Sequence, residues 1–128
     1  MKGENNLLKE LERILKKLLS NNSTISIATI SSVEGLPILS LIPEGYNETR
    51  ISAMVASMLS LSEMAMVEME IGEFNQLYIK GVDGYLLVFD ADTAVLAVST
   101  TEKAKLGLIF HECERVAREI SELLKKDN

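Results

Sequence analysis

The sequence has no tryptophan, two prolines and one cysteine, and aromatic residues make up only 5% of its 128 positions. A single cysteine cannot form a disulfide within the chain, and an unpaired thiol is typical of a reducing cytoplasm. A chain of this length buries enough surface to fold as one domain without cross-links. Basic residues are outnumbered 13 to 19 by acidic ones, which gives a net charge of −6. That balance argues against nucleic acid as a partner, because nucleic-acid-binding proteins present a basic face.

The first twenty residues, MKGENNLLKELERILKKLLS, intersperse charges among the apolar positions. Neither the apolar core of a signal peptide nor a membrane span has this pattern. Together with the single cysteine, it predicts a cytoplasmic protein that does not insert into a membrane. No internal repeat, low-complexity tract or linker interrupts the sequence, so we read residues 1–128 as a single domain.

Hydrophobic periodicity predicts three helices and five strands. The helices span about residues 4–20, 48–71 and 100–125, and the strands span about residues 25–31, 36–41, 74–80, 85–90 and 94–99. Asp83-Gly84 is a strong signal for a hairpin between the third and fourth strands. Pro37 lacks the backbone N–H that an inner strand would need, so it places the second strand at a sheet edge.

The element boundaries and the strand composition together indicate a fold class. Gly72 is expected to end the second helix, and Ser99 with Glu102 has capping-box spacing at the start of the third. The strands over 85–90 and 94–99 are apolar at successive positions, so both of their faces should be covered. The order α-β-β-α-β-β-β-α therefore predicts an α/β fold, a three-layer α/β/α sandwich around a five-stranded, mostly antiparallel sheet.

The predicted helix over 48–71 has apolar residues on two opposite faces when its residues are placed at 100° intervals. The broader face, which we assign to the sheet, consists of Ile51, Met54, Val55, Met58, Leu59, Leu61, Ala65, Met66 and Met69. The opposite face, where a monomer should be polar, consists of Ala53, Ala56, Ser57, Ser60, Met64 and Val67. Small residues there allow another helix to approach closely, and leaving Met64 and Val67 in water costs about 25 cal/mol per Å² of apolar surface. This face is expected to pack on a partner, most simply a second copy about a two-fold axis; a covering loop or scattered surface alanines are the alternative.

Few residues suggest chemistry. An apolar strand that ends in Asp90-Ala91-Asp92 resembles the nucleophile strand of phosphotransferases, but a strand-connecting turn is the simpler interpretation. His111 and Cys113 lack the spacing of a zinc site, and we interpret them as a solvated histidine and a buried thiol. The sequence contains no phosphate-binding loop and no nucleophile-elbow pattern. It therefore predicts no catalytic residue, metal or cofactor, and a protein that is not an enzyme.

The order of these elements and several local sequences resemble the roadblock / dynein light chain family over nearly the whole chain. The resemblance rests on VEGLPILS at Val33–Ser40, where Glu34 replaces an aspartate common in the family, and on the Ala/Met-rich helix Ile51–Ile71. It continues through YIKGVDGYLLVF at Tyr78–Phe89 and the segment from Ala94 to Ile120. Each motif alone is weak, and their order and spacing together are fairly specific.

The resemblance implies a profilin-like roadblock fold and a homodimer built from the second helix and the third strand, with two sheets joined edge to edge. It also implies a small Ras-like GTPase as a partner, regulated or carried without an arginine finger and without a cofactor. For self-association we expect Ala53, Ser57, Ser60, Met64, Val67, Phe74, Gln76 and Tyr78. For the GTPase contact we expect an exposed margin of Ser52, Ala56, Glu63 and Glu70. A small-ligand sensor and a structural subunit of a heterodimer are the alternative functions.

Overall fold

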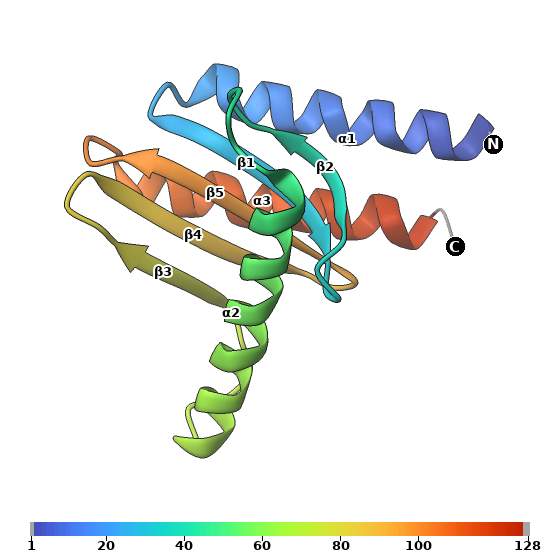
Figure 1. Cartoon of the computed structure of the whole chain (residues 1–128). Helices are drawn as coiled ribbons and strands as arrows, with labels where there is room; N and C mark the ends of the chain where they lie inside the picture. Colours follow the sequence, from blue (N-terminus) through green and yellow to red (C-terminus); the bar gives the residue numbers. More distant parts are fainter. Residues whose placement is uncertain (1, 127–128) are drawn as a thin grey trace.

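The computed structural model describes residues 2–126, and for residues 2–5 it describes the backbone alone. The elements follow the predicted α-β-β-α-β-β-β-α order. They are α1 (Lys2–Asn21), β1 (Ile25–Ser32), β2 (Pro37–Leu41), α2 (Glu48–Glu68), β3 (Gln76–Lys80), β4 (Gly84–Ala91), β5 (Ala94–Thr101) and α3 (Leu106–Lys126). The predicted three-layer α/β/α arrangement is confirmed: α1 and α3 lie on one face of the sheet and α2 on the other (Figure 1).

The five strands form one antiparallel sheet in the order β2-β1-β5-β4-β3. The strands β2 and β3 are its two edges, which agrees with the edge position that Pro37 predicted for β2. Five successive residues of β5, Ala94 to Val98, are buried, because helices cover both faces of this central strand. Alternation along the strands divides the core in two, since successive side chains point to opposite faces.

The larger half of the core lies under α1 and α3 and includes Leu15, Ile30, Phe89 and Ile120. The smaller half lies under α2 and consists of Val55, Leu59, Val88, Val95 and Ala97, with half-buried neighbours around them. The helix α2 therefore covers a much smaller cluster of buried side chains than α1 and α3 cover together.

The predicted start of the third helix at residue 100 is wrong. The strand β5 continues to Thr101, whose backbone N–H donates to the carbonyl of Thr24 at 2.9 Å, and α3 begins only at Leu106. Ser99 therefore lies in a strand and caps no helix, because cross-strand pairing with β1 extends the ladder past it. The predicted start of β3 at Phe74 is also too early, since pairing with β4 begins at Gln76.

The end of α2 also differs from the prediction, which placed it at residue 71. The helix ends at Glu68, and Glu70, with φ of 55°, adopts the left-handed conformation that was expected of Gly72. The N–H of Ile71 donates to the carbonyl of Met66 at 3.1 Å, and the N–H of Glu70 donates to the carbonyl of Val67 at 3.2 Å. These two bonds form a Schellman motif, which satisfies carbonyls at the helix end before Gly72 is reached.

Candidate protein-interaction surface

The helix α2 packs on the sheet through only part of its length. Its four buried residues, Ser52, Val55, Ala56 and Leu59, all lie in the N-terminal part of the helix. Figure 1 shows the C-terminal turns of α2 running past the edge strand β3 and away from the sheet. The side chains of Leu61, Met64 and Val67 in this projecting part are 66%, 68% and 77% exposed. An apolar helix surface of this kind is typical of an interaction site.

By length and composition, α2 is also apolar enough to cross a membrane. The packing of Val55 and Leu59 against the sheet shows that part of this apolar character belongs to the protein core. The remainder lies on the projecting turns described above.

The neighbouring sheet edge is open. The strand β3 pairs with β4 on one side and has no strand on the other among residues 2–126. Tyr78 and Ile79 on this strand are exposed, and the Oε1 atom of Gln76 is buried without a hydrogen-bond partner in the described part of the chain. The Tyr78 ring is fixed by Phe110, whose ring meets it edge-on with centroids 5.9 Å apart. An unpaired edge with exposed side chains is a template for another strand.

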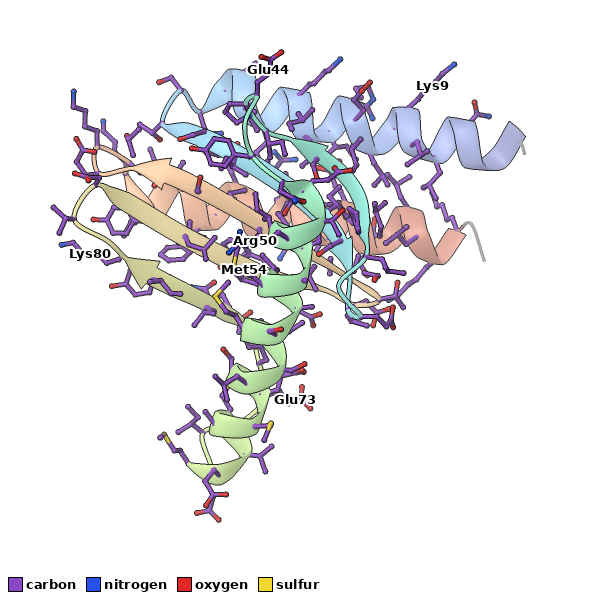
Figure 2. All side chains as sticks on the ribbon, in the orientation of Figure 1. Lys9, Glu44, Arg50, Met54, Glu73 and Lys80 are labelled. Carbon is purple, nitrogen blue, oxygen red and sulfur yellow. The ribbon has the colours of Figure 1, made fainter. Side chains whose placement is uncertain are left out.

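An apolar groove lies between α2 and the sheet. It has a volume of about 610 Å³ and is lined by Arg50, Ala53, Met54, Ser57, Met58 and Leu86. Figure 2 shows Arg50 and Met54 extending from α2 over the sheet on the same side of the helix. The groove and the projecting turns of α2 are thus neighbouring apolar surfaces, one concave and one convex.

A second apolar cavity of about 340 Å³ adjoins the groove and shares Met54, Met58 and Leu86 with it. Its polar side chains are Thr29, Tyr46 and Ser99, and the hydroxyl of Thr29 is buried without a partner in the described residues. The cavity bears on the ligand-sensor alternative, which calls for several polar groups converging on a bound molecule. Its lining is instead almost wholly apolar and carries no charged side chain.

The predicted assignment of the two faces of α2 is partly wrong. Met54, Leu61, Ala65 and Met69 were assigned to the sheet, but all four are exposed. The assignment from helical angles assumed that the sheet lies under the whole length of α2. The sheet instead ends near the middle of the helix. Val55, Met58 and Leu59 do pack toward the sheet as predicted.

The predicted exposure of Ser52 and Ala56 is also wrong. Ser52 is 0% and Ala56 7% exposed, because the turn between β1 and β2 packs against this side of α2. A Cβ atom placed on Gly35 in that turn would lie 3.3 Å from the Ala56 Cβ. Glu63 and Glu70, the other two residues expected at the GTPase contact, are exposed.

The residues expected at the self-association surface fall on three segments. Those on α2 (Ala53, Ser57, Ser60, Met64 and Val67) are exposed, as is Tyr78 on β3. Phe74 lies in the loop before β3 and packs against the α2 half of the core, and Gln76 is half-buried. Sequence reasoning missed Arg50 and Leu86 of the groove. Arg50 is the only basic residue between Glu48 and Glu73, and this isolation in the sequence could have singled it out as a candidate site residue.

The structure describes the surroundings of Asp90, Asp92, Cys113 and His111, the residues that were considered for chemistry. The N–H of Asp92 donates to the Oδ1 atom of Asp90 at 3.1 Å, which forms the turn between β4 and β5. Burial, and to a smaller extent the charge of Glu112, raises the pKa of Cys113 to about 12, so this thiol stays protonated at neutral pH. His111 is exposed. No three His, Cys, Asp or Glu side chains in the described residues are grouped so that they could hold a metal ion.

Comparison with known proteins identifies relatives of this architecture. A structure of MglB in a tetrameric arrangement matches with a TM-score of 0.87 and 16% identity, covering 95% of this chain and 93% of that one. The gliding protein MglB of Thermus thermophilus matches with a TM-score of 0.85 and 15% identity, covering 94% and 92%. A Roadblock/LC7 domain from Streptomyces avermitilis matches with a TM-score of 0.80 and 18% identity, covering 86% and 93%.

At these identities the structural matches establish the fold. No curated protein matches the chain in sequence. The model of the Roadblock/LC7 domain family matches residues 11–100, which run from the middle of α1 through β5 and include the groove, the projecting turns and the open edge. The chain therefore belongs to the Roadblock/LC7 domain family.

Proposed function

We propose that this protein is a cytoplasmic homodimer that binds a small Ras-like GTPase and regulates or carries it without supplying catalytic residues. The observation that supports dimerisation best is the projecting apolar part of α2 beside an apolar groove and an open strand edge. Convex and concave surfaces on one molecule are complementary when two copies meet about a two-fold axis.

The position of the axis follows from the open edge. An axis beside β3 pairs this strand antiparallel with the β3 of a second copy, so the two sheets become continuous. Because α2 runs past β3, its C-terminal turns then lie over the sheet of the second copy, at the groove beside α2. Leu61, Met64 and Val67 lose contact with water there, and full burial of such a side chain contributes about 1.5–3 kcal/mol.

The proposed GTPase partner rests on the family, because resemblance to roadblock proteins implies small Ras-like GTPases as partners. Glu63 and Glu70 are exposed on and just after α2, and we assign the GTPase contact to them. A protein of this kind acts by repositioning residues that the GTPase already has, since phosphoryl transfer depends mostly on positioning and electrostatics.

Substitution of Ser57 by arginine tests the dimer. Ser57 is exposed and lines the groove, so Ser57→Arg places a long charged side chain in the proposed contact without disturbing the core. We expect the dissociation constant of the dimer to rise at least about tenfold in sedimentation equilibrium. Ser20→Arg, on an exposed turn of α1, is the matched control and should leave the dimer intact. A Ser57→Arg variant as dimeric as the wild type would contradict the proposed interface.

Retention of a GTPase tests the partner. Immobilised protein is incubated with native lysate in the presence of GDP or a non-hydrolysable GTP analogue, and the retained proteins are identified by mass spectrometry. We expect a Ras-like GTPase to be retained more with the analogue, and Glu63→Lys/Glu70→Lys to reduce its retention about tenfold. The control Glu44→Lys/Glu102→Lys changes the charge equally at two other exposed sites. Absence of any small GTPase in both nucleotide states would refute this part of the proposal and leave the dimer standing.

A further inference from the structure

The charge on α2 is unevenly distributed along the helix. Arg50 in the first turn is its only basic residue and shares that turn with Glu48, which lies about 160° around the helix from it. Glu63 and Glu68 lie in the C-terminal part of the helix. The Arg50 side chain lines the apolar groove together with Met54 and Leu86. Among the described residues it makes no salt bridge or side-chain hydrogen bond. A guanidinium group beside apolar surface is best matched by a carboxylate, which it binds through two parallel hydrogen bonds.

Arg50 and Glu68 lie on the same face of α2. They are 18 positions apart, which is five turns of an α-helix and about 27 Å along its axis. Between them the same face presents Ser57 and Leu61, within about 20° of the line that joins the two charges. One face of α2 thus has a positive end, an uncharged middle and a negative end. Such a face is complementary to the same face of a second α2 helix that runs in the opposite direction.

We propose that Arg50 pairs with Glu68 of the partner subunit, and that the two resulting ion pairs select a second copy of this chain in antiparallel register. This inference rests on the dimer proposed above and adds the residues that specify it. A two-fold axis at the level of residue 59 brings position 50 of one helix opposite position 68 of the other. The same operation brings Ser57 opposite Leu61 of the partner subunit, so a small side chain meets a large one.

The antiparallel register is also the one that electrostatics favours. A parallel pair of α2 helices would place Arg50 beside Arg50 of the partner subunit and oppose the two acidic ends. In the antiparallel pair, Glu68 of each copy lies near the positive end of the partner's helix dipole, and Arg50 lies near the negative end. The ion pairs are next to apolar groove side chains, where attraction between charges is screened less than in open solvent.

A charge-exchange experiment tests this inference. Arg50→Glu gives a protomer with glutamate at both positions, and Glu68→Arg gives one with arginine at both. Each variant alone should dimerise at least about tenfold more weakly than the wild type in sedimentation equilibrium, because like charges face each other twice. An equimolar mixture restores both opposite-charge pairs. We expect it to form a heterodimer within about threefold of the wild-type affinity, identified by its mass in native mass spectrometry.

Glu102→Arg is the matched control, since it makes the same charge change at an exposed residue outside α2. It should leave dimerisation within about threefold of the wild type. We expect the wild type to dimerise at about 1 μM. A wild-type chain that is still monomeric at about 100 μM, a hundredfold higher, would refute the homodimer itself. A dimeric wild type whose two variants dimerise normally, or whose mixture shows no preference for the heterodimer, would refute the Arg50–Glu68 pairing alone.

Discussion

Replacing Gly84 with alanine is expected to lower the free energy of unfolding by about 3 kcal/mol, the upper part of the range for overpacked sites. Gly84 begins β4, and a Cβ atom there would overlap the carbonyl oxygen of Thr100 and lie 3.2 Å from its carbonyl carbon. Both atoms belong to the backbone of the central strand β5, so no side-chain rotation can relieve the overlap. The melting temperature should fall by about 10 °C for a domain of this size.

Gly81→Ala is the control for this prediction, because it lies in the same hairpin. A Cβ on Gly81 would meet the Gly84 carbonyl oxygen at 3.5 Å, an ordinary contact, and Gly81 keeps the N–H that donates to that oxygen at 2.7 Å. Its melting temperature should stay within about 3 °C of the wild type. Equal melting temperatures for the two variants, measured by circular dichroism, would show that β4 moves away from Thr100 at little cost.

The fold was predictable because its elements are locally consistent. The periodicity of α1, the Asp83-Gly84 turn and the continuous apolar character of β5 each indicate one structure, and their order leaves few arrangements of the sheet. The boundaries were less predictable, since they depend on contacts distant in sequence. Thr101 belongs to β5 because Thr24 accepts its N–H, and no pattern near residue 101 contains that information.

The interaction surface was predictable in kind and only partly in position. Two apolar faces on one helix indicated a surplus of apolar surface, and the exposed side chains of Met64 and Val67 agree with that expectation. The sequence could not show how far the sheet extends beneath α2, so Leu61 was assigned to the core. It also could not show that a turn 17 residues upstream covers Ser52, because that contact forms only in the tertiary structure.

The turn that covers Ser52 leads to the second large effect, which we expect from Gly35→Ala. Gly35 has φ of +97°, and a Cβ on it would lie 3.3 Å from the Ala56 Cβ and 3.4 Å from the Ala53 Cα. The variant therefore combines an unfavourable backbone conformation, which costs about 1–3 kcal/mol, with a push against the part of α2 that holds the helix on the sheet. We expect a total loss of about 3 kcal/mol in urea unfolding.

Gly45→Ala separates the two contributions, because Gly45 has φ of +93° and a Cβ on it would meet no atom of the described residues within 4 Å. Gly45→Ala should lose only the stability that the unfavourable backbone conformation costs. The free energies of unfolding of the two variants should therefore differ by about 1 kcal/mol or more. The two should differ in association as well. Displacement of α2 by the Gly35→Ala substitution alters the groove that Ala53 lines, so this variant should dimerise more weakly under conditions where it is fully folded, whereas Gly45→Ala should not. Equal stability losses and equal dimer affinities for the two variants would contradict this expectation. They would mean that α2 moves away from the β1–β2 turn at little cost, and that its position on the sheet does not set the geometry of the interaction surface.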